Sequence, residues 1–286
     1  MKIEKALVIL LGRLEFDELI KTRIFHIIKN GIDWYDFLNY CVRTNMVCLV
    51  YKNMIKLGIE KLLPATIKYN MRYHYEQNAI RNKYLLACVE NITQDLDGKG
   101  ISIVPIKGIK FLSTIYKEDP GVRQLNDIDI LSEVSSKKTI SNYMQEKGFG
   151  SYLINNYDAF CQNGEEEQSH FYISFSAMES HDDLRIDFDY AHSKQFIKKI
   201  RENNYLYELC YLCKSFYSLM GHDNLPNEVD RLDYIKLVDM YEYCKYYLAD
   251  MTEVEIKSEA EKLHFIDELN YVLEALEQLN LQIFVS

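Results

Sequence analysis

The sequence is poor in the residues that interrupt regular structure. It holds only 4 Pro and 11 Gly in 286 residues, a composition that favours helices with few long loops. No apolar run approaches the roughly 20 residues of a membrane-spanning helix. The short patch ALVILL at residues 6–11 is followed by charge and not by the small-residue cleavage site of a signal peptide. We therefore expect a soluble protein without a membrane partner.

Basic residues are scarce relative to acidic ones. The chain has 33 Lys and Arg against 43 Asp and Glu, which gives a net charge of −10. Long-range capture of a polyanion needs a basic field, so this balance disfavours nucleic acid as a partner and favours a small molecule or a protein. The 7 cysteines show no framework of short spacings, which is typical of reduced thiols and predicts a cytoplasmic location. Cys210 and Cys213 have the CxxC spacing, but their apolar flanks favour a buried helix over a metal site.

The pattern along the chain predicts three regions. Residues 1–98 indicate helices, including one that Asp33 caps and Gly58 ends, and another that follows Pro64. Residues 99–192 alternate between strand and helix signals, with strands expected at 101–106, at 127–132 and at three places further on. Residues 193–286 return to helical periodicity. The predicted fold class is α+β, with a small mixed sheet flanked by N- and C-terminal helical regions.

Two pairs of aspartates are embedded in the predicted strands. Asp127 and Asp129 lie in NDIDIL, and Asp187 and Asp189 lie in RIDFDY. Residues i and i+2 of a strand point to the same face, so each pair places two like charges side by side, and burial would raise the pKa of their carboxyl groups. Bound Mg²⁺, which prefers oxygen ligands, resolves this conflict. If the two strands are neighbours, the pairs could serve two-metal phosphoryl chemistry.

Cationic and small residues precede the first acidic pair. Lys107 and Gly108 follow a predicted strand and open a helix, a place where backbone N–H groups can approach a phosphate. Arg123 could contact a phosphate with two hydrogen bonds, or it could pair with Glu118 or Asp119 across the turn. Asp239 lies on a predicted C-terminal helix, where helix-surface charge is the favoured interpretation.

Together these segments resemble a known family. VPIKG at residues 104–108, IYKEDPGVRQLNDIDIL at 115–131 and IDFDYAH at 186–192 are similar to the uncharacterised nucleotidyltransferase family of the DNA polymerase β superfamily. The resemblance extends over residues 30 to 250. It implies a minimal nucleotidyltransferase sheet between the helical regions, and an enzyme that transfers a nucleoside monophosphate from an NTP and releases pyrophosphate.

The resemblance also implies roles for individual residues. Asp127 and Asp129 would be paired metal ligands, with a third carboxylate from Asp187 acting as ligand or base, and two Mg²⁺ ions as cofactors. Lys107, Gly108 and Arg123 would lie near the triphosphate of the NTP.

The sequence departs from the family pattern at two places. Gly-Ile replaces the superfamily's Gly-Ser at residues 108–109, and Asp189 occupies a position where His is expected, so that either Asp187 or Asp189 could be the third carboxylate. These departures keep open a second hypothesis, a catalytically decayed nucleotide-binding or partner-binding module. A toxin-like enzyme that modifies tRNA is less favoured because of the net charge. The leading hypothesis has a small-molecule or protein acceptor.

Overall fold

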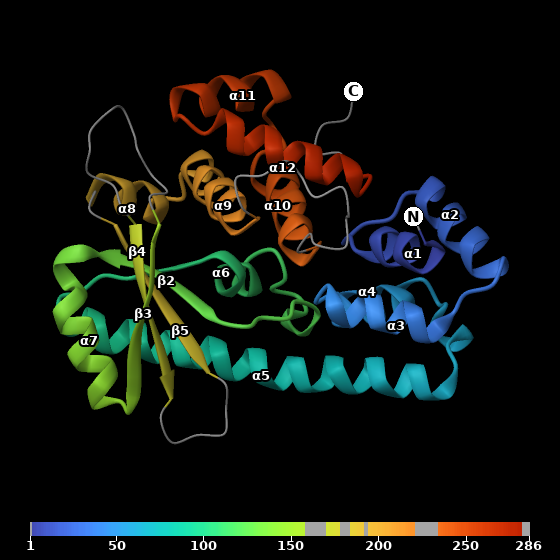
Figure 1. Cartoon of the computed structure of the whole chain (residues 1–286), viewed down its shortest axis with the longest axis horizontal. Coiled ribbons are helices and arrows are strands. Elements are labelled where there is room, and N and C mark those ends of the chain that lie inside the picture. Colours follow the sequence, from blue (N-terminus) through green and yellow to red (C-terminus); the bar gives the residue numbers. More distant parts are fainter. Residues whose placement is uncertain (1, 158–169, 178–183, 192–193, 221–233, 282–286) are drawn as a thin grey trace.

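The N-terminal third of the chain is helical. The computed structural model describes residues 2–157, 170–177, 184–191, 194–220 and 234–281. Four short helices, α1 (Ile3–Leu11), α2 (Glu18–Lys29), α3 (Trp34–Arg43) and α4 (Val47–Lys56), precede the long helix α5 (Ala65–Asp97). In Figure 1, α5 runs along one edge of the molecule, past α3 and α4 and on to the sheet.

The predicted helix between Asp33 and Gly58 is in fact two helices. Asp33 caps α3 as expected, accepting hydrogen bonds from the backbone N–H groups of Tyr35 and Asp36. The chain then turns at Asn45, whose φ of 56° is left-handed, a conformation that ends helices and that Asn tolerates better than most residues. The helical periodicity on both sides of this turn conceals the break in the sequence.

The middle of the chain forms a five-stranded sheet in the described residues. The strands are β1 (Val104–Ile106), β2 (Ile128–Glu133), β3 (Phe149–Tyr157), β4 (His170–Ala177) and β5 (Arg185–Ala191), in the order β1-β2-β5-β4-β3. Strands β2 and β5 are parallel and the other neighbouring pairs are antiparallel. Helices α6 (Lys107–Ser113) and α7 (Lys137–Glu146) connect strands, and β1 is shorter than the strand predicted at 101–106.

Each face of the sheet packs on helices. Ile128, Ile130, Ile186 and Phe188 are fully buried in a core shared with the C-terminal half of α5 and with α7. The opposite face meets the C-terminal helices α8 (Lys194–Arg201) and α9 (Tyr205–Met220). Helices α10 (Tyr234–Tyr247), α11 (Glu253–Lys262) and α12 (Ile266–Gln278) pack around α9 and extend the same core (Figure 1). Because Leu131 on β2 and Ala191 on β5 belong to this second core, the odd-numbered residues of both strands face the C-terminal helices.

The architecture confirms the predicted α+β class, with helical regions on both sides of a small mixed sheet. Cys210 and Cys213 are buried on α9. Burial raises the pKa of the Cys210 thiol to about 12, as expected of core cysteines. Among the helices of the described ranges, none is long and apolar enough to cross a membrane.

Candidate active site

The two acidic pairs meet on one face of the sheet. In the parallel ladder between β2 and β5, Asp129 is the register partner of Asp187, and Leu131 is the partner of Asp189. Because side chains alternate along a strand, Asp129, Asp187 and Asp189 all project toward the C-terminal helices, and Asp127 precedes β2 on the same side. The structure therefore brings together the four aspartates that the sequence analysis selected.

Two cationic side chains bridge the acidic pairs. The Lys107 Nζ lies 2.6 Å from Asp129 Oδ1 and 3.4 Å from Asp189 Oδ2. The Arg185 Nη2 lies 2.5 Å from Asp187 Oδ2 and 3.2 Å from Asp127 Oδ2. Each cation thus joins one carboxylate of the β2 segment to one of β5. Four carboxyl groups are met by two cations, so the cluster holds an excess of acidic groups.

Neighbouring hydroxyl groups complete the cluster. Tyr211 on α9 donates a hydrogen bond to Asp189 Oδ2, and its ring centre lies 5.4 Å from the Lys107 Nζ, within range of a cation–π contact. Ser174 on β4 donates to Asp187 Oδ1 at 2.5 Å. Sequence reasoning selected neither residue, because each reaches the site only through tertiary structure.

Lys107 occupies an unusual backbone conformation. Its φ is 54°, a left-handed value that costs a non-glycine residue free energy and persists only when surrounding contacts enforce it. The ion pairs with Asp129 and Asp189 hold the far end of the Lys107 side chain. The conformation and the ion pairs together fix the Lys107 side chain over the acidic face.

Access of solvent to the cluster is uneven. The side chains of Asp127 and Arg185 are 29% and 36% exposed, whereas that of Asp187 is 4% exposed. The cluster is therefore more open to solvent at Asp127 and Arg185 than at Asp187.

Burial and crowding shift the protonation of the cluster. Burial, together with the charges of Asp129 and Asp187, raises the pKa of Asp127 to about 6. Burial raises the pKa of Asp189 to about 7; Lys107 opposes this rise and Asp129 adds to it. Burial alone would lower the pKa of Lys107, but Asp129 and Asp189 outweigh it, so the pKa lies above its ordinary value. Lys107 is therefore charged at neutral pH, whereas burial disfavours the charged forms of Asp127 and Asp189.

The raised pKa values predict that metal-free protein loses stability as pH rises. Asp127 and Asp189 bind protons more tightly in the folded than in the unfolded chain, where their pKa is about 4. The stabilisation that these bound protons give the folded state is fully present below pH 4. It is lost as the pH rises through the folded-state pKa values of about 6 and 7. In EDTA, we expect the free energy of unfolding of the wild type to fall by about 2 kcal/mol relative to Asp189→Asn between pH 5 and 8.

Urea unfolding at several pH values measures this difference. Glu133→Gln, which removes an acid at the end of the neighbouring strand β2, is the matched control and should follow the wild type. A difference between wild type and Asp189→Asn that is flat, or that grows in favour of the wild type with pH, would contradict the assigned protonation.

Gly108 and Arg123 are occupied by contacts within the protein. A Cβ atom at Gly108 would lie 2.5 Å from the Leu125 Cδ2, so the packing of α6 on the loop before β2 favours glycine here. Arg123 is 6% exposed, and its Nε and Nη2 bind both carboxylate oxygens of Asp239 at 2.6–3.0 Å. Phosphate contacts of Gly108 and Arg123 stay predictions. Asp239 is 3% exposed, so its interpretation as helix-surface charge is wrong.

Helix α5 holds the loop that leads to the first acidic pair. Asn82 Nδ2 donates to the backbone carbonyls of Pro120 and Arg123 at 2.6 and 2.7 Å. Asn78 Nδ2 donates to those of Gly121 and Arg123 at 2.7 and 3.1 Å. These amides fix the approach of the chain to Asp127.

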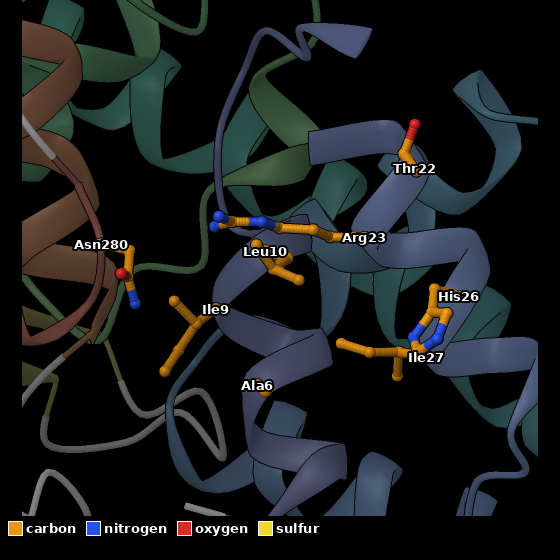
Figure 2. Close-up of a pocket in the computed structure, with 8 residues that line it drawn as sticks. All are labelled: Ala6, Ile9, Leu10, Thr22, Arg23, His26, Ile27 and Asn280. Atoms are coloured by element: carbon orange, nitrogen blue, oxygen red, sulfur yellow. The ribbon is translucent and has the colours of Figure 1, made fainter. Parts of the chain in front are cut away.

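The carboxylates do not form a preassembled metal cage. Within the described ranges, no group of three or more His, Cys, Asp or Glu is arranged to hold a metal ion. A cavity of about 360 Å³ lies elsewhere, between α1, α2 and Asn280 after α12 (Figure 2). Its walls are largely apolar side chains such as Ile9, Leu10 and Ile27, and it contains none of the aspartates. The candidate active site is therefore the acidic face of β2 and β5.

A small mixed sheet that gathers aspartates from two adjacent strands, between helical regions, is the arrangement expected of a nucleotidyltransferase core. The chain belongs to a family described as "Uncharacterised nucleotidyltransferase", whose model matches residues 30–281. No curated protein and no solved structure matches the chain.

Proposed function

We propose that the protein transfers a nucleoside monophosphate from an NTP to a small-molecule or protein acceptor, in a Mg²⁺-dependent reaction that releases pyrophosphate. The observation that carries this proposal is the convergence of Asp127, Asp129, Asp187 and Asp189 on one face of adjacent parallel strands. Membership of the nucleotidyltransferase family supports the same reaction class. The net charge of −10 favours acceptors other than nucleic acid.

The donor chemistry of the cluster suits Mg²⁺. The metal prefers carboxylate oxygens and substrate phosphates. Burial and neighbouring carboxylates raise the pKa of Asp127 and of Asp189, so a bound cation would stabilise their charged forms. Asp127 and Asp129 would hold the metal, with Asp187 or Asp189 as the third carboxylate. When bound, the ions would neutralise charge on the phosphates and activate the acceptor hydroxyl.

Lys107 and Arg185 would exchange partners during binding. In the structure they neutralise the aspartates. Bound metal ions would neutralise the aspartates in their place. Lys107 and Arg185 would then lie next to the triphosphate of a metal-bound NTP, and both side chains can bind phosphate. Lys107 would bind the phosphates through its compact positive charge, and Arg185 would bind them through two parallel hydrogen bonds. Catalysis would then rest on positioning and charge neutralisation.

Replacing Arg185 with Gln separates its two proposed roles, which are pairing with the aspartates in competition with metal and binding the phosphates of the NTP. We expect Mn²⁺ to bind about threefold to tenfold more tightly without nucleotide, because Asp127 and Asp187 lose a competing cation. Affinity for a non-hydrolysable NTP with Mg²⁺ should fall about tenfold, because a phosphate ligand is lost. Electron paramagnetic resonance of Mn²⁺ and calorimetry measure the two affinities. Lys194→Gln, at a cation paired with Glu133 at 3.5 Å, is the control. Weaker Mn²⁺ binding in Arg185→Gln would show that the arginine only supports the fold.

A pyrophosphate-release assay tests the proposed reaction. The purified chain is incubated with each NTP and Mg²⁺, with candidate acceptors and alone, so that self-modification is included. We expect pyrophosphate release that depends on the nucleotide and is lost in EDTA. Nucleotide binding without release in any condition would overturn the proposed transfer.

The same measurement tests a second candidate function. Because Lys107 and Arg185 hold the aspartates and no metal-holding group is found in the described residues, a nucleotide-binding or partner-binding module that has lost catalysis is also consistent with the site. Binding without turnover would favour this module.

A further inference from the structure

Helices α6 and α9 are joined by two contacts that lie one turn apart. The Lys107 Nζ lies 5.4 Å from the ring centre of Tyr211, and the Lys110 Nζ lies 2.7 Å from Glu208 Oε2. Residues three apart in a helix lie on the same side of it, so each helix uses one side for both of its contacts. The two contacts therefore lie together on the surface where α6 and α9 meet.

The first contact belongs to the acidic face of the sheet. The Lys107 Nζ also lies 2.6 Å from Asp129 Oδ1 and 3.4 Å from Asp189 Oδ2. The Tyr211 hydroxyl donates a hydrogen bond to the same oxygen of Asp189. Two helices thus bring one cation and one hydroxyl group to a single carboxylate, and the docking of α9 on α6 decides where both groups meet it.

The second contact is a buried ion pair. The side chains of Lys110 and Glu208 are 13% and 2% exposed. The Tyr243 hydroxyl on α10 lies 3.0 Å from Glu208 Oε2 and 3.0 Å from the backbone carbonyl oxygen of Tyr205. Glu208 Oε1 is buried and has no hydrogen-bond partner within the described ranges. A buried carboxylate that is only partly satisfied costs free energy relative to an apolar side chain of similar size. Stability of the fold therefore does not account for the pair.

We infer that the Lys110–Glu208 pair positions Lys107 and Tyr211 on Asp189 for the reaction. A buried ion pair is satisfied only when its two charges meet, whereas apolar side chains can repack in several ways. The pair therefore restricts how α9 can shift along α6. Lys110 and Glu208 are positioning residues, which act through the residues one turn away from them. The inference rests on the proposed function, in which Lys107 binds the triphosphate of the NTP.

Replacing the pair with apolar residues, as in Lys110→Met with Glu208→Leu, separates positioning from folding. No charge is left unpaired, and the hydroxyl group on α10 keeps its backbone acceptor, so the free energy of unfolding in urea should equal or exceed that of the wild type. The kcat for pyrophosphate release should fall about tenfold or more, because small displacements of a positioned group slow a reaction to this extent. Lys257→Met with Glu253→Leu, at a half-exposed ion pair on α11, is the matched control and should keep the kcat of the wild type.

The ¹⁵N NMR signal of the Lys107 ammonium group reports positioning without turnover. The wild type should show this signal, because the ion pair with Asp129 slows the exchange of the ammonium protons with water. Lys107→Gln identifies the signal by removing it. In the double variant of Lys110 and Glu208 we expect the signal to be lost. Lys110→Arg, which keeps a cation beside the carboxylate, should retain the signal and a kcat within about threefold of the wild type.

The two readouts distinguish this inference from the proposed transfer. A wild type that releases no pyrophosphate would remove the proposed reaction, and the Lys107 signal alone would then decide the positioning role. A signal that is absent from the wild type, or that the double variant keeps, would overturn the inference. So would a double variant with the kcat of an active wild type. A double variant that loses stability together with kcat would also overturn it, because the pair would then only support the fold.

Discussion

Replacing both Asp127 and Asp129 with Asn should lower the rate of pyrophosphate release by at least about 10³-fold, because the transition state loses several kcal/mol of charge stabilisation. Asp129 is central to the cluster, since its register partners are Ile106, which precedes Lys107, and Asp187. Asn keeps the size of each side chain but removes the anionic oxygens that a divalent cation prefers.

The double variant should remain folded. Lys107 keeps Asp189 as a partner, and Arg185 keeps Asp187. Two carboxylates and two cations then balance, so relief of the acidic excess should leave the free energy of unfolding equal to that of the wild type or higher. Urea unfolding establishes this before kinetics are compared. Glu133→Gln, on the same strand, should keep full activity. Undiminished metal and nucleotide affinity in the double variant would remove the basis for the assignment.

Replacing Asp239 with Ala should destabilise the protein by about 3–5 kcal/mol, the usual result of removing one partner of a buried ion pair. Arg123 and Asp239 are 6% and 3% exposed. The guanidinium would lose three hydrogen bonds to the carboxylate, and the Tyr116 hydroxyl would lose its acceptor at 2.8 Å. Since this pair connects the loop before β2 to α10, its loss should also make the loop that leads to Asp127 more mobile.

Urea unfolding measures the effect against a matched surface pair. Lys2 and Asp36 lie 3.2 Å apart with side chains 62% and 44% exposed, and Asp36→Ala should cost less than about 1 kcal/mol. Replacing both buried partners, as in Arg123→Met with Asp239→Leu, should recover most of the lost stability because no charge is left unpaired. A cost below about 1 kcal/mol for Asp239→Ala would mean that the pair does not hold the loop.

Local patterns in the sequence were sufficient for the strands and for the acidic face. Alternation in NDIDIL and RIDFDY places each pair of aspartates on one face whatever the tertiary fold. The same rule identifies Arg185, which lies two residues before Asp187 and therefore on the same face. We selected only acids from that strand, although the signal for the cation was present.

Long-range partners left no comparable signal. Arg123 was selected for its capacity to form two parallel hydrogen bonds, and the structure uses that capacity on Asp239, 116 residues further along the chain. Tyr211 and Ser174 reach the site through the packing of α9 and the register of β4. Such contacts depend on how elements dock, which hydrophobic periodicity does not specify.

A crystal structure with Mn²⁺ and a non-hydrolysable NTP tests the assignment of the acidic face most directly. We expect an anomalous signal from Mn²⁺ between Asp127 and Asp129, with Asp187 or Asp189 as the third carboxylate, and Lys107 and Arg185 turned to the triphosphate. A nucleotide bound elsewhere, with Lys107 still on Asp129 and Arg185 still on Asp187, would contradict it.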